Sequence, residues 1–144
     1  MSESVSFEEY LRKHDTLTYS NKGASMEPLL RQGRDLFTVR KKGAERCRAG
    51  DVVLFRRGEN YVLHRIVEVR SEEYVCQGDN TVRAEFGVTD EDILGVMTGF
   101  VRKGRKHSVS EPLYRVYTGA MLCTRGMRVL CKRAAMKVKG LLRP

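Results

Sequence analysis

The sequence predicts a mainly β protein: an antiparallel β domain with a short N-terminal helix and a basic, amphipathic helical segment at the C-terminal end. Between residues 16 and 110, β-branched and aromatic residues form short runs separated by Gly- and Asp-containing turns, without the long helical segments of βαβ units. From residue 111 onward, apolar residues recur at intervals of three and four, which is the period of a helix. The chain is therefore expected to divide into residues 1–15, 16–110 and 111–144.

Residues 4–15 are predicted to form the N-terminal helix, with Ser4 or Ser6 as its cap. The turn at Gly58-Glu59 separates two β-rich runs by two residues and predicts a tight hairpin. Strands are expected at residues 16–19, 34–40, 50–57, 60–70, 73–80 and 92–104, and residues 106–110 are expected to pair back on the last of these. These strands are connected by short turns, which favours one antiparallel β domain.

Composition and charge narrow the class of protein. The chain has 144 residues, of which 41% are hydrophobic and 31% charged, as in ordinary globular domains. Its N-terminal stretch lacks the basic and apolar regions of a signal peptide, and no window is apolar enough to span a membrane. The four cysteines show no C-x-x-C spacing, which argues against structural zinc and favours reduced thiols in a cytosolic protein. No cofactor and no metal are expected.

The positive charge of +9 belongs to the C-terminal third. Residues 1–100 contain 15 Lys and Arg against 17 Asp and Glu, whereas residues 101–144 contain 12 against one. Gly119 and Gly126 are expected to weaken the C-terminal helix and to break it in two. The basic residues are expected to lie mainly on the opposite side of this helical segment from the apolar ones, which are Leu113, Val116, Tyr117, Ala120, Met121, Met127, Leu130, Ala134, Val138 and Leu141.

Three interpretations of this tail stay open. Its apolar side packs on the β domain while the charges face water, or it lies in the headgroup layer of an anionic membrane, which would make a cytoplasmic protein peripheral at the membrane. The third interpretation is binding to nucleic acid, since basic side chains suit phosphates. No specific nucleic acid is expected, because the sequence contains no recognition motif of the known kinds.

Three polar residues stand out as candidates for catalysis. Ser25 lies in the turn after the first predicted strand, His64 lies within the strand of residues 60–70, and Asp79 lies in the turn that ends the next strand. A serine hydroxyl needs a base within hydrogen-bond reach, which a neutral imidazole supplies, and a carboxylate can hold the imidazole in the productive tautomer. Each residue alone is an ordinary turn or strand residue, so the combination carries the prediction.

The order of five sequence blocks resembles a known family. "GASMEPLLRQGRD", "GDVVLF", "VLHRIV", "QGDN" and "ILGVMTG" follow one another over about residues 16–105. This pattern is similar to the serine peptidases of the signal peptidase I and LexA-type repressor group. His64 followed by Arg65 looks like the Ser-His type of the endoplasmic reticulum and archaea, because bacterial relatives place a lysine at this position.

The resemblance implies roles for individual residues. Ser25 corresponds to the nucleophile, His64 to the general base, and Asp79 to the aspartate that is the best candidate for orienting that base. Gly23, Ala24, Met26 and Asn80 correspond to oxyanion-hole and positioning residues, and the Ser25 N–H would donate to the oxyanion.

Three features depart from the family. Gly23 replaces a serine that can add an oxyanion donor, and Glu85 is the acid offered after the QGDN block, in an uncertain register. The N-terminal membrane anchor of signal peptidases is missing, which puts preprotein processing at the outer face of a membrane in doubt.

The resulting hypothesis is a serine endopeptidase that cleaves an extended peptide or preprotein through an acyl-enzyme. The alternative is a regulatory, peptide-binding module that keeps the fold without turnover. A self-cleaving repressor is disfavoured, because the 15 residues before the β domain cannot hold a helix-turn-helix.

Overall fold

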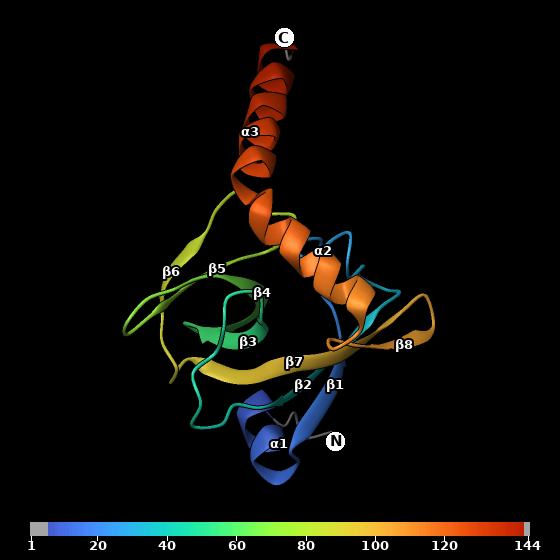
Figure 1. The fold of residues 1–144 in the computed structure, drawn as a ribbon, viewed down its shortest axis with the longest axis vertical. Coiled ribbons are helices and arrows are strands. Elements are labelled where there is room, and N and C mark those ends of the chain that lie inside the picture. Colours follow the sequence, from blue (N-terminus) through green and yellow to red (C-terminus); the bar gives the residue numbers. More distant parts are fainter. Residues whose placement is uncertain (1–5, 143–144) are drawn as a thin grey trace.

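The computed structural model describes residues 6–142 and consists of eight strands and three helices (Figure 1). The N-terminal helix α1 spans Phe7–Lys13, and the C-terminal helices α2 and α3 span Pro112–Cys123 and Arg125–Leu142. The strands are β1 (Thr16–Ser20), β2 (Leu36–Lys41), β3 (Val52–Arg57), β4 (Asn60–Val69), β5 (Tyr74–Gln77), β6 (Glu85–Val88), β7 (Ile93–Arg102) and β8 (Arg105–Ser108).

All strand pairs are antiparallel, and they form one sheet in the order β1-β2-β7-β3-β4-β5-β6, with β8 added to β7. Strand β7 holds the sheet together, because it pairs with β2 over residues 95–101, with β3 over residues 93–96 and with β8 over residues 99–102. In the β3–β4 hairpin, Arg57 pairs with Asn60 across Gly58-Glu59, and Gly58 has a φ of 61°. The predicted two-residue turn is thus confirmed.

Strand β3 lies within a curved sheet (Figure 1) and contributes apolar residues to both faces of that sheet. Val52 and Leu54 face one cluster of buried residues, and Val53 and Phe55 face another. Both clusters draw on β4, where Leu63 belongs to the first and Ile66 to the second. This alternation places the neighbouring His64 on the same side of β4 as Ile66.

Helix α1 covers the first cluster. Leu11 is buried in that cluster, and the Ser6 side chain accepts a hydrogen bond from the Glu9 N–H, so Ser6 is the N-cap. Glu8 accepts a hydrogen bond from Tyr61 on β4, which ties the helix to the sheet. The helix is shorter than the predicted range of residues 4–15, and Ser4 lies outside the described residues.

The mainly β class and the terminal helices are confirmed, while several boundaries differ. Strand β6 was not predicted, because its exposed Phe86 and a Gly87 with a φ of 75° do not give an alternating pattern. Strand β2 begins two residues later than predicted, because Asp35 belongs to the preceding turn, where its carboxylate accepts the N–H groups of Arg31 and Lys103. The C-terminal helix is divided at Thr124, between the two glycines rather than at either of them.

Candidate active site

Ser25 lies in the long connection between β1 and β2, which buried apolar residues hold in place. Met26, Leu29 and Leu30 are all in the first core cluster, and the side chain of Asn21 donates a hydrogen bond to the Leu30 carbonyl. Ser25 itself is half-buried, while its neighbours Gly23 and Ala24 are exposed. The core therefore anchors both sides of the loop and leaves the serine within reach of solvent.

A second turn, residues 78–80 between β5 and β6, supports the serine loop from beside it. The Asn80 N–H donates to the Ser25 carbonyl at 2.8 Å, and the Asn80 amide donates to the Ala24 carbonyl at 3.0 Å. A Cβ on Gly78 would lie 2.5 Å from the Ser25 carbonyl oxygen and 3.1 Å from Cδ2 of His64. Only a glycine fits where these two segments meet, because real Cβ contacts do not reach 2.5 Å.

His64 reaches this junction from β4. Its ring packs edge-on against Phe55, and its side chain is only 10% exposed. Burial lowers the pKa of His64 below its ordinary value of 6.5, although the nearby carboxylates of Glu85 and Asp79 partly oppose the shift. The imidazole is therefore neutral at pH 7 and available as a base.

The carboxylate that contacts the His64 ring comes from β6. Oε1 of Glu85 lies 3.2 Å from His64 Nδ1. The two groups are not aligned for a hydrogen bond, and Nδ1 is buried without a hydrogen-bond partner among the residues that the structure describes. A buried ring nitrogen without a partner is costly, and Glu85 is the carboxylate that lies beside it.

Ser25, His64 and Glu85 line one cleft of about 520 Å³. The cleft lies between the end of β1 and strand β4, and its lining includes Phe7, Tyr19 and Tyr61, whose rings pack edge-to-face. No hydrogen bond joins Ser25 to His64 among the described side chains. Catalytic hydrogen bonds are often long in unliganded enzymes and shorten when substrate binds.

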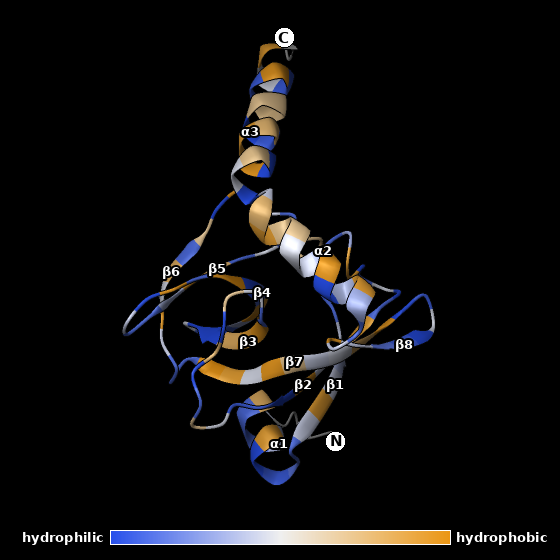
Figure 2. Ribbon diagram, viewed as in Figure 1, coloured by the Kyte–Doolittle hydropathy of each residue, from blue (hydrophilic) through white to orange (hydrophobic). Residues whose placement is uncertain are grey.

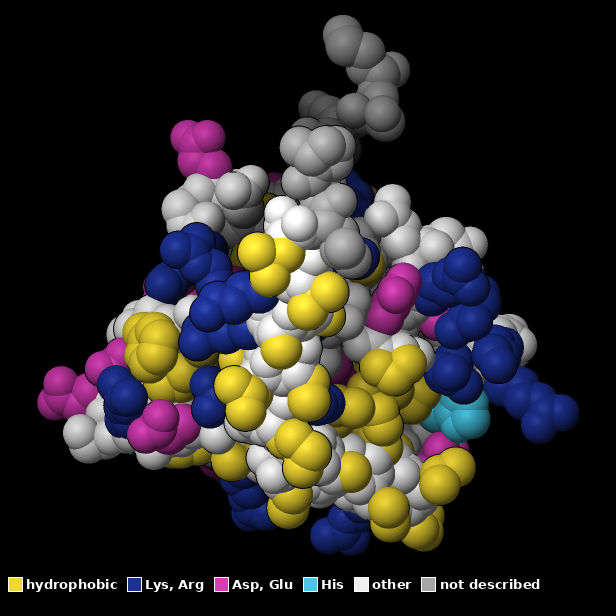
Figure 3. All heavy atoms as spheres, turned by 90° about the horizontal axis from the view of Figure 1, so that it is seen from above, with side chains coloured by type: hydrophobic (Ala, Val, Ile, Leu, Met, Phe, Trp, Pro, Cys, Tyr) yellow, Lys and Arg dark blue, Asp and Glu magenta, His cyan; other side chains and the backbone are white. Residues whose placement is uncertain are grey.

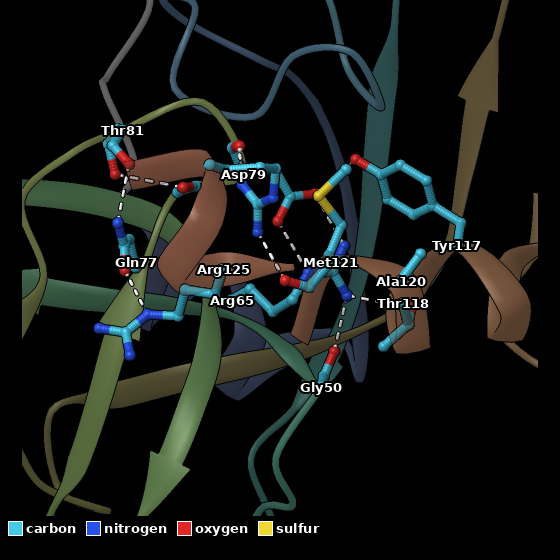
Figure 4. A network of polar contacts seen from close by, with 12 residues as sticks. Gly50, Arg65, Gln77, Asp79, Thr81, Tyr117, Thr118, Ala120, Met121 and Arg125 are labelled. Atoms are coloured by element: carbon cyan, nitrogen blue, oxygen red, sulfur yellow. Dashed lines mark hydrogen bonds and ion pairs between the residues drawn. The ribbon is translucent and has the colours of Figure 1, made fainter. Parts of the chain in front are cut away.

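Asp79 does not line this cleft, and its carboxylate is held by Arg65 (Figure 4). The guanidinium of Arg65 donates two hydrogen bonds to the Asp79 carboxylate, at 2.8 and 2.9 Å, and the Tyr117 hydroxyl donates a third at 2.7 Å. The Arg65 and Asp79 side chains are 1% and 2% exposed. This ion pair raises the pKa of Arg65, and burial beside Asp79 raises the pKa of Tyr117. The structure therefore does not bring Asp79 to His64 Nδ1.

The C-terminal helices take part in holding the 78–80 turn. Arg128 of α3 donates to the Asp79 carbonyl, and Lys132 donates to both the backbone and the side-chain oxygen of Asn80. Arg125 bonds the Gln77 side chain, which in turn donates to the Thr81 carbonyl (Figure 4). The turn beside Ser25 is thus held by side chains from two elements, Arg65 of β4 and the basic residues of α3.

The oxyanion donor expected from the Ser25 backbone is free to act. No acceptor among residues 6–142 takes the Ser25 N–H. Gly23 has a φ of 75°, a left-handed conformation that strains any residue with a Cβ, and its own N–H donates to Gln32. This backbone geometry explains why a glycine stands at position 23.

The sequence identified some of the residues that the structure brings to this cleft and to the adjacent turn. It identified Ser25 and His64, which the structure places in one cleft, and it offered Glu85 without fixing its position. It gave no signal for Arg128 or Lys132, because their role depends on how α3 lies against the 78–80 turn. The Arg that follows His64 was the available signal for the partner of Asp79.

A scan against protein-family models finds none that matches this chain. A search of the curated proteins likewise returns no match.

The buried Arg65–Asp79 pair predicts a large effect on stability. Replacing Asp79 with Asn leaves the Arg65 charge buried without its counter-ion, so we expect the free energy of unfolding to fall by about 3 kcal/mol. The corresponding fall in Tm is roughly 10 °C. Thermal unfolding followed by circular dichroism measures this change, with Glu72→Gln as the control, since Glu72 is an exposed carboxylate. A Tm equal to that of the wild type would show that the pair does not stabilise the fold.

Proposed function

We propose that the protein is a serine endopeptidase in which Ser25 is the nucleophile and His64 the general base. The observation that carries this proposal is the shared cleft, in which a half-buried serine and a buried, neutral histidine lie beside a carboxylate. The resemblance to the signal-peptidase and LexA-type group supports the same roles and a fold of that type. Glu85 rather than Asp79 then orients the base, since it is the carboxylate that contacts the ring.

Each residue has a defined part in the reaction. The Nε2 atom of His64 removes the proton from the Ser25 hydroxyl, whose oxygen attacks the carbonyl carbon of the scissile amide. The imidazolium then gives this proton to the leaving amine, and the C–N bond breaks to leave a serine ester. Water, deprotonated by His64, attacks that ester. The C–O bond then breaks, the imidazolium returns its proton to the Ser25 oxygen, and the second product leaves as a carboxylic acid. Glu85 stabilises the imidazolium in both half-reactions by its charge and by accepting from Nδ1–H.

The oxyanion of each tetrahedral intermediate needs donors that do not have to reorganise. The Ser25 N–H is unengaged among the described residues and is the candidate donor from this chain. Asp79 contributes indirectly: with Arg65 it fixes the turn that holds the backbone of Ser25. Asp79 is accordingly a positioning residue in this proposal.

The cleft suits an extended peptide as the substrate. It runs past the end of β1, a strand at the edge of the sheet, whose free backbone groups can pair with an added strand. The aromatic group of Phe7, Tyr19 and Tyr61 gives part of the cleft an apolar wall. The resemblance implies small residues next to the scissile bond, in a peptide or preprotein.

A second candidate function is a peptide-binding module without turnover. Gly23 supplies no side-chain donor, and Ser25 forms no hydrogen bond with His64 within the described region. Such a module would bind peptides in the same cleft but would not form an ester at Ser25.

Covalent labelling separates the two candidates. A fluorophosphonate reacts with an activated serine, so we expect one adduct, which peptide mass spectrometry places on Ser25. The variant Ser25→Ala should not react, and His64→Ala should react about 10²–10⁴-fold more slowly, because it lacks the base. Ser71→Ala serves as the control, since Ser71 is exposed and its backbone carbonyl, which accepts a hydrogen bond from Arg46, is kept in the variant. If wild-type protein is not labelled, or if labelling persists in Ser25→Ala, the peptidase proposal is wrong.

The role of Glu85 predicts a change in pH dependence. Only neutral His64 acts as a base, so the labelling rate of the wild type should fall toward acid with a midpoint below pH 6.5. Replacing Glu85 with Gln removes a charge that favours the imidazolium, and the midpoint should move to a still lower pH. The plateau rate should fall at least about tenfold, or ~1.4 kcal/mol, because the imidazolium loses its partner.

The labelling rate of wild type, Glu85→Gln and the exposed control Glu72→Gln between acid and neutral pH measures both effects. A midpoint that stays in place or rises in Glu85→Gln would contradict the assignment of Glu85.

A further inference from the structure

A row of apolar side chains runs along α2 and α3 on the side that faces solvent. Figure 2 shows hydrophobic positions recurring along both helices, and Figure 3 shows hydrophobic side chains gathered on the face seen from the C-terminal end. The row, here called the apolar stripe, recurs at intervals of three and four and consists of exposed residues: Leu113, Val116, Ala120, Cys123, Met127, Leu130, Ala134, Val138 and Leu141. Leu113 is 82% exposed, Leu130 69% and Leu141 85%.

The opposite side of the two helices makes the contacts with the β domain. Tyr114 is buried in the first core cluster, and the Thr118 hydroxyl accepts a hydrogen bond from Arg65. Along α3, the residues that bind the domain are Arg125, Arg128 and Lys132. The structure thus leaves the apolar stripe uncovered, and packing on the β domain does not account for it. A continuous row of this kind is unusual on a monomer and marks an interaction surface.

The charge beside the stripe is of one sign. Helices α2 and α3 contain seven Lys and Arg and no Asp or Glu. Three of the seven cations bind the domain, and the other four are exposed: Arg115, Arg133, Lys137 and Lys139. A surface that covers the stripe therefore has to be apolar along the row and anionic at its sides.

We propose that the apolar stripe seats the protein on an anionic lipid surface. Helix α3 would lie in the headgroup layer, with a row about 21 Å long from Met127 to Leu141 turned toward the acyl chains. Each exposed cation near such a surface strengthens the attraction to anionic headgroups. Within residues 6–142, no helix has both the length and the apolarity needed to cross a bilayer, so the helix lies along the surface and does not span it.

Two other occupants fit the observations less well. The spacing of three and four up to Ala134 would also suit a coiled coil between two copies, but the next position of that repeat is Lys137. Two copies paired along the stripe would bring together the four exposed cations of each copy, and neither helix has an Asp or Glu to pair with them. Nucleic acid would use the cations but would leave the stripe exposed, and Arg128 and Lys132 already bind the 78–80 turn.

Docking of α3 on lipid would also fix the position of the cleft. Because Arg128 and Lys132 bind the turn that supports Ser25, a docked α3 holds the cleft at a fixed position relative to the lipid surface. Lipid binding itself needs neither Ser25 nor His64, so the two proposals are tested separately.

Vesicle binding by the full chain tests the proposal. Wild-type protein is incubated with phosphatidylcholine vesicles with and without phosphatidylglycerol, and the bound fraction is measured by co-sedimentation. We expect binding to the anionic vesicles that weakens with salt, and little binding to the neutral ones. The double variant Leu130→Gln, Val138→Gln removes apolar area without changing the charge and should bind at least about tenfold more weakly. The pair Lys137→Gln, Lys139→Gln should also weaken binding.

Phe86→Gln is the matched control, since Phe86 is an exposed apolar residue on β6, away from the stripe. All substituted side chains are exposed, so the variants should keep the Tm of the wild type. Unchanged vesicle binding by the Leu130 and Val138 variant would overturn the proposal. It would also be overturned by a lipid-free dimer that this variant dissociates, or by binding to double-stranded DNA in a buffer where anionic vesicles stay unbound.

Discussion

The side chains of Arg65 and Asp79 meet where β4, the 78–80 turn and α2 come together, and the position of Ser25 depends on this contact. Two buried charges are tolerated there because their hydrogen bonds are aligned, and because Gly50, Thr118 and Tyr117 provide further partners. The pair fixes the turn whose backbone binds the Ser25 carbonyl. His64 precedes Arg65 on the same strand. Adjacent residues of β4 therefore supply the proposed base and the side chain that holds the turn beside Ser25.

Neighbouring residues on a strand point to opposite faces, and this alternation separates the two functions. His64 faces the cleft and Glu85, while Arg65 faces the helices and Asp79. A carboxylate that served both as the partner of Arg65 and as the partner of His64 would have to reach both faces of β4. This geometry explains why Asp79 pairs with Arg65 while a different carboxylate, that of Glu85, lies beside His64.

Much of the fold could be predicted because it is encoded locally. Alternating residues indicated β3 and β4, Gly58-Glu59 indicated their hairpin, and two serines, Ser4 and Ser6, were candidates for the cap of α1, which the structure places at Ser6. Strand β6 was not predicted, because Gly87 and exposed residues interrupt the alternation of apolar and polar residues that indicates a strand. The candidates Ser25 and His64 could be named from residue types and order, whereas the contact between His64 and Glu85 depends on how β6 lies beside β5 and β4. No local pattern reports such long-range pairing.

The C-terminal helices add a constraint that the sequence pattern predicted only in part. Their period and their charge were readable, but the side that packs on the domain was not. The structure shows that basic residues of α3 bind the 78–80 turn, while the apolar row faces outward. The helices therefore support the candidate site on one side and present an unoccupied surface on the other.

The central claim is that the 78–80 turn holds Ser25 in place for His64, and Gly78→Ala tests it most directly. The added methyl group would lie 2.5 Å from the Ser25 carbonyl oxygen, so the serine loop has to move while the cores stay intact. The account predicts that fluorophosphonate labelling slows by about 10²-fold in the folded variant, whereas Gly119→Ala, which adds a methyl group in open space, keeps the wild-type rate. A folded Gly78→Ala protein that is labelled as fast as the wild type would contradict the account.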